Sequence, residues 1–347
     1  MDILLNLTIM LCSLFAIVIA CITFTNAIEH LGEHLGLSNR TMGSVFAAIG
    51  TALPETLVPL VAILGAYIAG TNVELSQEIG IGAILGSPFM ISTFAFFITS
   101  IFIYIFAKTK FRKLEINANP KPILRDLSFF LTTYTIAILG AFIKFQYSHI
   151  LFAVILFALY ILYIVKTIKT DEGETPNAEE IPLYFQICPT NLTIHTIILG
   201  IQILCSIAGI IYFTHLFVNT ITFFAQITQI NPMILSLFLA PIATELPEIF
   251  NSIIWVKESK DNIAFANLSG AIVYQASILT AIGLLLTKWT FSIEALINVI
   301  LVYASVITLY ITISKCKKNI PVKIFFFNGF YWLIYIIYVC FDKGIIK

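Results

Sequence analysis

The apolar residues of this chain gather in long runs that alternate with short polar intervals. Ten runs are close to 20 residues long, which is about the length of helix that crosses a hydrocarbon core roughly 30 Å thick. The sequence therefore predicts ten transmembrane helices. They lie at residues 4–27, 41–68, 79–106, 127–143, 149–166, 194–218, 232–256, 262–286, 290–313 and 323–341.

The longest polar interval, residues 167–193, separates the fifth predicted helix from the sixth. We expect it to be a linker between a first half at 1–166 and a second half at 194–347. Because each half crosses the membrane an odd number of times, the second half enters from the opposite face. The predicted fold is an all-α polytopic membrane protein built from two inverted five-helix repeats, as in many secondary transporters.

Composition supports this prediction. Apolar residues make up 59% of the chain and charged residues 11%, against roughly 45–50% and about 25% in soluble domains. So few charges cannot cover the surface of a soluble protein of this size. The bilayer is therefore the predicted surrounding of most helices.

The basic residues are distributed unequally between the two faces of the predicted bundle. If loops alternate between faces, all but four of the 19 Lys and Arg residues lie on the face that carries the linker. Because cytoplasmic loops are enriched in Lys and Arg, we expect a cytoplasmic linker, both termini outside the cytoplasm, and a plasma (inner) membrane location. The four exceptions are Lys144, Lys288, Lys343 and Lys347.

Several functional classes receive no support from the sequence. The formal net charge is zero, and the six cysteines have no CxxC spacing, so neither nucleic acid nor a thiolate metal site is indicated. The sequence contains no Walker motif or Gly-rich nucleotide loop. We therefore expect a protein that is not an enzyme, needs no cofactor and binds no nucleotide.

One motif, Thr-x-Leu-Pro-Glu, occurs inside the second predicted helix of each half, at residues 51–55 and 244–248. A proline inside a helix removes one backbone hydrogen bond and frees a carbonyl group. A carboxylate near the bilayer centre costs about 2.5–3.5 kcal/mol on insertion scales, and a simple kink needs no acid.

The motif therefore predicts a mid-membrane cation site with Glu55 and Glu248 as metal ligands. Further oxygens are expected from Glu245, from the hydroxyls of Thr51 and Thr244, and from carbonyls freed where the helices unwind at the prolines. Such a hard, oxygen-rich site suits Ca²⁺.

The third helix of each half adds small and polar residues. Gly82 and Gly86 in the first half, and Ala266 and Gly270 in the second, have the spacing that lets another helix approach closely. This spacing alone indicates only packing. Because this spacing occurs beside the Pro-Glu segments, it suggests two broken or tightly packed helix pairs. The third helices also add three polar side chains to the predicted site: Ser87, Asn267 and Gln275.

Two regions of the chain resemble a known family, the cation/calcium exchanger superfamily, which includes the sodium/calcium exchangers. The residues that resemble its first alpha-repeat are Leu35 to Ser38, Gly43 and Ala48 to Glu55, and those similar to its second are Ala243 to Glu248 and Asn262 to Gly270. The resemblance places the repeats at about 41–106 and 232–286. It implies secondary active antiport of Ca²⁺ against Na⁺ or H⁺ by alternating access, with Glu55 and Glu248 as central ligands and the first and sixth helices as the mobile group.

The chain also departs from the family pattern. Where a Ser is usual, it has Ala52 and Glu245, so one hydroxyl is lost and one carboxylate is gained. Ile91 and Ala271 occupy positions where polar residues are expected, and such positions help to hold Na⁺ in sodium-coupled members. A carboxyl group can exchange a proton for a cation, so H⁺ is a substitute for Na⁺, and the coupling ion stays open.

Three alternatives remain at this point. Mg²⁺, Mn²⁺ or Na⁺ could replace Ca²⁺ as the substrate of an antiporter, and a cation channel could use the same acids. From a different class, His30-x-x-Glu33-His34 matches the H-x-x-E-H pattern of a group of zinc peptidases, which needs a third, distant ligand. A pH-responsive turn is a further interpretation of this segment, because His30 and His34 lie one helical turn apart. The favoured interpretation is an ordinary solvated turn at the membrane interface.

Overall fold

The computed structural model describes residues 2–34, 47–70, 73–143, 145–170, 182–186, 192–316 and 320–342. These residues form α1 (Asp2–His34), α3 (Ala47–Ala69), α4 (Val73–Phe89), η2 (Met90–Ala95), α5 (Phe96–Lys108), α6 (Pro120–Phe142), α7 (Ser148–Thr170), α8 (Leu192–Thr228), α9 (Pro232–Lys257), α10 (Asp261–Tyr274), η3 (Gln275–Leu279), α11 (Thr280–Leu286), α12 (Ile293–Ser314) and α13 (Lys323–Asp342). Within the described ranges, α4, η2 and α5 form one continuous rod, and so do α10, η3 and α11. Ten helical rods therefore cover the ten predicted spans.

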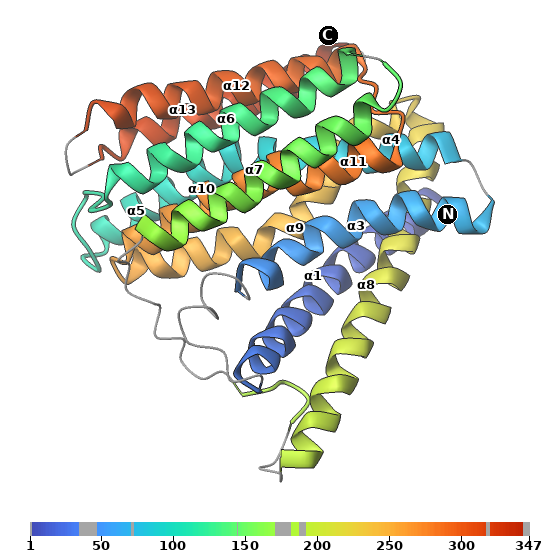
Figure 1. Cartoon of the computed structure of the whole chain (residues 1–347), viewed down its shortest axis with the longest axis horizontal. Coiled ribbons are helices and arrows are strands. Elements are labelled where there is room, and N and C mark those ends of the chain that lie inside the picture. Colours follow the sequence, from blue (N-terminus) through green and yellow to red (C-terminus); the bar gives the residue numbers. More distant parts are fainter. Residues whose placement is uncertain are drawn as a thin grey trace.

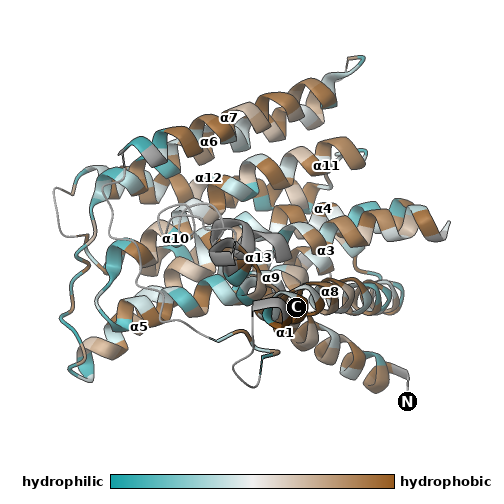
Figure 2. Cartoon of the chain, turned by 60° about the horizontal axis from the view of Figure 1, so that its bottom comes forward, coloured by the Kyte–Doolittle hydropathy of each residue, from teal (hydrophilic) through white to brown (hydrophobic). Residues whose placement is uncertain are grey.

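Length and hydropathy agree with a membrane-embedded bundle. In the described part of the chain, nine rods are long and apolar enough to cross a bilayer, and α3 contributes a shorter apolar stretch, Glu55–Ile68. Figure 2 shows hydrophobic residues along the rods and hydrophilic residues collected at the connections. Large apolar side chains on the outside, such as Phe15, Leu204 and Ile300, are 63–69% exposed, as expected for residues that face lipid.

Local sequence signals set where two of the helices begin. Asn119 and Asn231 each precede a proline, and each side chain accepts a hydrogen bond from the backbone N–H two residues later. An Asn N-cap followed by Pro at the first helical position is a strong start signal. It places the start of α6 at Pro120, seven residues before the predicted span, because the first turns of this helix are polar.

The helices divide into a tilted pair and a larger bundle (Figure 1). α1 packs along α8 over most of its length, and α4 packs along α9 in the same way. Figure 1 shows α1 and α8 side by side at an angle to the helices of the bundle. The pair meets α3, α4 and α9 in one buried apolar cluster that includes Ile17, Phe217, Val58, Ala83 and Ala240.

The small residues of α4 permit its close contact with α9. A Cβ atom on Gly82 would overlap the carbonyl oxygen of Met233, and one on Gly86 would overlap that of Leu237. The prediction of close approach is confirmed at these positions. It is wrong for Gly270, where a Cβ would lie 3.5 Å from the Tyr163 hydroxyl, an ordinary contact. Gly82 and Gly86 pack against the backbone of α9, whereas Gly270 faces a side chain of α7.

The expected unwinding at the prolines is also wrong for α9, which remains helical through Pro241 and Pro247. Membrane helices tolerate proline when neighbouring groups satisfy the freed backbone atoms. The departure from α-helical geometry instead occurs in the π-helical segments η2 and η3, in the next rod of each half. In η2, the Ser92 carbonyl accepts hydrogen bonds from Ser305 Oγ and Asn328 Nδ2, both at 2.7 Å.

Candidate functional site

Three buried carboxylates meet where α3 and α9 pack together. Glu55 lies on α3, and Glu245 and Glu248 lie on α9, where their i, i+3 spacing puts them on one face. One carboxylate oxygen from each residue lies within 4.8 Å of the others, and each residue is at most 2% exposed. Three acids this close, away from water, repel one another unless protons or a cation balance their charge.

The spacing of these oxygens fits a calcium-sized ion. Ca²⁺ binds oxygen ligands at about 2.3–2.6 Å, so two oxygens on opposite sides of one ion lie about 4.6–5.2 Å apart. Glu55 adds a second indication, because its carboxylate lies against the carboxylate of Glu245. Two carboxylates can interact in this way only when a proton or a cation lies between them.

Glu245 is held in place by polar neighbours from three elements. The Thr244 hydroxyl donates to its Oε1 at 3.1 Å, and Gln275 Nε2, at the start of η3, donates to its Oε2 at 2.9 Å. The Ser87 hydroxyl on α4 also interacts with this carboxylate. The carboxylate that the chain gains relative to the family pattern is therefore built into the cluster.

The structure brings together most of the residues that the sequence predicted for the site. Glu55, Glu245, Glu248 and the hydrogen-bonding partners of Glu245 form one group. Asn267 lies beside it, but its Nδ2 donates to the backbone oxygen of Glu248 and to Ser252 Oγ, each at 3.3 Å. Asn267 thus connects α10 to α9 through the backbone of Glu248 and the side chain of Ser252. The predicted ligand Thr51 belongs to α3, and its side chain lies outside the described residues, as do Leu35 to Ser38 and Gly43.

Sequence reasoning missed two hydroxyl groups next to the cluster. The hydroxyls of Thr56 and Tyr274 lie 2.6 Å apart and join α3 to α10. Each residue directly adjoins a predicted ligand, Glu55 or Gln275. Their positions in the repeats were a usable signal, but their pairing over 218 positions was not visible in the sequence.

Two symmetric contacts hold the ends of the bundle. Asp261 at the start of α10 accepts two hydrogen bonds from Arg112, at 2.6 and 2.7 Å, and one from the Asn117 backbone at 2.8 Å. At the opposite end, Gln77 near the start of α4 accepts the Lys288 backbone N–H at 3.2 Å. In both cases the connection after a π-containing rod of one half is held by the equivalent rod of the other half. These contacts hold α10 at one end of the bundle and α4 at the other.

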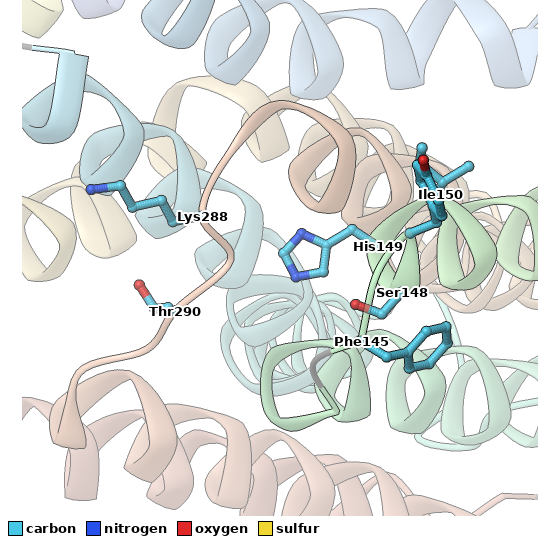
Figure 3. A pocket seen from close by; sticks show the side chains of 7 residues that line it. Phe145, Ser148, His149, Ile150, Lys288 and Thr290 are labelled. Atoms are coloured by element: carbon cyan, nitrogen blue, oxygen red, sulfur yellow. The ribbon is translucent and has the colours of Figure 1, made fainter.

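An open pocket of about 590 Å³ lies apart from the cluster, between the α6–α7 and α11–α12 connections (Figure 3). In this view His149 is turned into the pocket, while the amino group of Lys288 points away from it. Lys288 instead pairs with Glu74 at 2.5 Å. The Lys288 amino group is therefore not directed into this pocket.

Comparison with known proteins decides the family. The family described as sodium/calcium exchanger protein matches residues 5–169 and 198–342, which is most of the chain. The chain belongs to the sodium/calcium exchanger protein family. Comparison with curated proteins gave no significant match.

Solved structures show that this exchanger has the fold of known members. A crystal structure of the H⁺/Ca²⁺ exchanger CAX aligns with a TM-score of 0.65 at 16% identity, over 98% of this chain and 88% of that one. The sodium-calcium exchanger NCX_Mj, soaked with Na⁺ and Sr²⁺, aligns with a TM-score of 0.57 at 20% identity, over 96% and 98% of the two chains. At these identities the likeness establishes the fold, including its inverted repeats.

Family membership also orders the alternatives from the sequence. The family is one of membrane transporters and not of enzymes, so antiport is favoured over the zinc peptidase and over the channel. In this exchanger, His30 faces His195 of α8, with ring centroids 5.9 Å apart. The side chains of Glu33 and His34 lie outside the described residues.

Proposed function

We propose that this exchanger carries Ca²⁺ in antiport with H⁺, by alternating access to one site formed by Glu55, Glu245 and Glu248. The observation that carries the proposal is the buried cluster of three carboxylates within 4.8 Å. The two structural neighbours support the choice of ions, because one is an H⁺/Ca²⁺ exchanger and the other a sodium-calcium exchanger.

The charge balance of the cluster supports exchange. One Ca²⁺ carries the charge of two protons, so it can replace them on three carboxylates without changing the net charge of the buried site. The site therefore carries one net negative charge in both states, so the exchange adds no unpaired charge in the membrane. Thr244, Ser87 and Gln275 orient Glu245, and Asn267 holds α10 against the backbone of Glu248.

The residues around the cluster favour H⁺ over Na⁺ as counter-ion. Ile91 is fully buried in η2, and neither Ile91 nor Ala271 offers an oxygen side chain. A second ion that needs its own ligands is therefore less well served than protons carried by the carboxylates.

The proposed topology keeps the sequence prediction: halves at 1–166 and 194–347, a cytoplasmic linker at 167–193, and both termini outside the cytoplasm in a plasma membrane.

The test is Ca²⁺ uptake into vesicles that contain the purified protein. Radioactive Ca²⁺ is added outside while an outward H⁺ gradient or an outward Na⁺ gradient is imposed separately. We expect uptake driven by H⁺ that a protonophore abolishes, and no uptake driven by Na⁺ alone. Uptake driven only by the Na⁺ gradient would show that Na⁺, and not H⁺, is the counter-ion. If neither gradient drives uptake, Ca²⁺ is not the substrate. Mg²⁺ and Mn²⁺ added as competitors test the other substrates, and flux that ignores the opposing gradient would indicate a channel.

A further inference from the structure

Two histidines face each other where α1 and α8 meet at the linker end of the molecule. His30 lies in the last turns of α1, and His195 lies in the first turn of α8. Their ring centroids are 5.9 Å apart, the rings are inclined by 70°, and both residues are half-buried. His30 opens the H-x-x-E-H motif, which the antiport function does not use, and the distant histidine that this motif lacked in the sequence is His195.

The ring of His195 is oriented by a neighbour. Its Nδ1 lies 2.5 Å from Gln186 Oε1. Because a carbonyl oxygen only accepts, Nδ1 carries the proton and donates, which leaves the lone pair of the neutral ring on Nε2. Metal-binding histidines almost always donate their other ring N–H to such an acceptor, which fixes the tautomer and the direction of the lone pair.

Gln186 is itself held in position, because residues 182–186 are bound to the α1/α8 pair. Asn26 on α1 accepts a hydrogen bond from the Tyr184 backbone at 3.1 Å, and Gln202 on α8 accepts one from the Phe185 backbone at 2.9 Å. Gln202 Nε2 also donates to Asn26 Oδ1 at 2.9 Å. Leu183 adds a buried apolar contact in a cluster with residues of both helices. The orienting residue thus belongs to a satisfied and preorganised network.

We propose that His30 and His195 bind one transition-metal ion of the Zn²⁺ class, with Gln186 orienting His195. Zn²⁺ binds imidazole nitrogen at about 2.0–2.1 Å, so two rings that share one ion have centroids about 5–6.4 Å apart. The observed separation lies in this range. Imidazole suits Zn²⁺, Ni²⁺ or Co²⁺, whereas Ca²⁺ prefers oxygen, so this site and the carboxylate cluster select different ions.

The bound ion would connect three segments of the chain. It would join α1 to α8 directly, and through Gln186 it would stabilise the attachment of residues 182–186 to both helices. His34 lies one turn after His30 on α1 and is the third histidine of this end of the chain, so its variant belongs in the test. The inference concerns metal binding alone and does not depend on the ions that the exchanger transports.

The first experiment titrates the metal-free, full-length protein in detergent with Co²⁺, followed by its visible absorption, and then displaces Co²⁺ with Zn²⁺. We expect one ion per chain, with binding weakened at least tenfold by His30→Ala and by His195→Ala. His215→Ala, an exposed histidine elsewhere on α8, is the matched control and keeps the affinity. Glu55→Gln also keeps it, which separates this site from the carboxylate cluster. Affinity unchanged in both His30→Ala and His195→Ala would overturn the proposal, whatever the result for His34→Ala.

A second experiment tests the orienting role of Gln186. Gln186→Leu removes the acceptor and should weaken Zn²⁺ binding about 10-fold or more, whereas Gln186→Glu keeps an acceptor and should retain it. Tyr184 and Phe185 are 47% and 43% exposed, so chymotrypsin can report on this segment. Zn²⁺ should slow cleavage there in the wild-type protein but not in His195→Ala. Equal affinity in Gln186→Leu and Gln186→Glu would contradict the orienting role, and equal protection in wild type and His195→Ala would contradict the link to the segment.

Discussion

At the scale of residues, the three glutamates differ in what holds them. Glu245 is fixed by Thr244 and Gln275, whereas the carboxylate of Glu55 lies against that of Glu245. A fixed carboxylate is preorganised for a ligand, since its orientation does not have to be set when the ion arrives. Because two carboxylates repel each other, the transported ion or a proton must lie between Glu55 and Glu245.

Replacement of either central ligand should abolish exchange. Glu55→Gln and Glu248→Gln each remove one negative charge from the ion, and loss of one partner of a buried charge pair costs about 2–5 kcal/mol. We therefore expect initial Ca²⁺ uptake to fall at least 30-fold in vesicles with equal amounts of protein. Glu78→Gln on α4, outside the cluster, is the control and should transport normally. Wild-type uptake in either cluster variant would remove that residue from the site.

Glu245 should determine how steeply transport depends on pH. Cation binding needs deprotonated carboxylates, so uptake falls as the pH is lowered, and the fall is steeper when more carboxylates compete for protons. Glu245→Ser removes one of the three and should flatten the profile of Ca²⁺ uptake against pH. The measurement is uptake from pH 5 to 9 with equal driving gradients. A profile identical to that of the wild type would place Glu245 outside the proton-exchanging group.

The sequence predicted the acids of this site but not the contacts around them. Glu55, Glu245 and Glu248 stand out because a carboxylate inside an apolar span is expensive. The partners Thr56 and Tyr274, or Arg112 and Asp261, are ordinary residues in their local sequences. Their roles arise from distant segments that meet only in the folded chain.

At the scale of elements, the π-helical segments and the glycines of α4 determine how the rods meet. Hydrophobic run length predicted all ten rods, because that signal depends only on local sequence. The ends were less predictable, and α8 continues ten residues beyond its predicted span. The continuation of α9 through Pro247 was not predictable either, because it depends on neighbours from other helices.

A methyl group on Gly86 should separate α4 from α9. Because its Cβ would overlap the Leu237 carbonyl oxygen, Gly86→Ala must move one helix, and such overpacking costs about 1–3 kcal/mol. We expect a lower melting temperature in detergent and reduced Ca²⁺ uptake. Gly65→Ala on α3 is the matched control, because a Cβ there meets no atom within 4 Å, and its stability should be equal or higher. Equal melting temperatures for the two variants would contradict the close approach.

At the scale of the whole molecule, the α1/α8 pair meets the bundle through an apolar cluster. Apolar contact is non-directional, so the pair can change its position without breaking a fixed set of polar bonds there. Within the pair, by contrast, Asn26 and Gln202 connect the two helices directly. This contrast agrees with the expectation, drawn from the family resemblance, that the first and sixth helices, α1 and α8, move together.

A disulfide within the pair should therefore leave transport intact. A Cβ on Gly209 would lie 3.5 Å from the Cβ of Ala20, at the short end of the range for disulfides, about 3.5–4.5 Å. Ala20→Cys with Gly209→Cys, in a variant that lacks the native cysteines, should oxidise and still take up Ca²⁺ at the rate of its reduced form. A maleimide gel shift measures the oxidised fraction. Transport lost on oxidation and recovered with dithiothreitol would show that α1 and α8 move relative to each other.

The attachment of residues 182–186 to the pair limits how far the pair can travel. α7 ends at Thr170 in the bundle, so only residues 171–181 join the bundle to a segment that is fixed on α1 and α8. Fully extended, each residue spans at most about 3.3–3.6 Å, which restricts this connection to roughly 40 Å. Each residue deleted from 171–181 would lower this upper limit by about 3.3–3.6 Å.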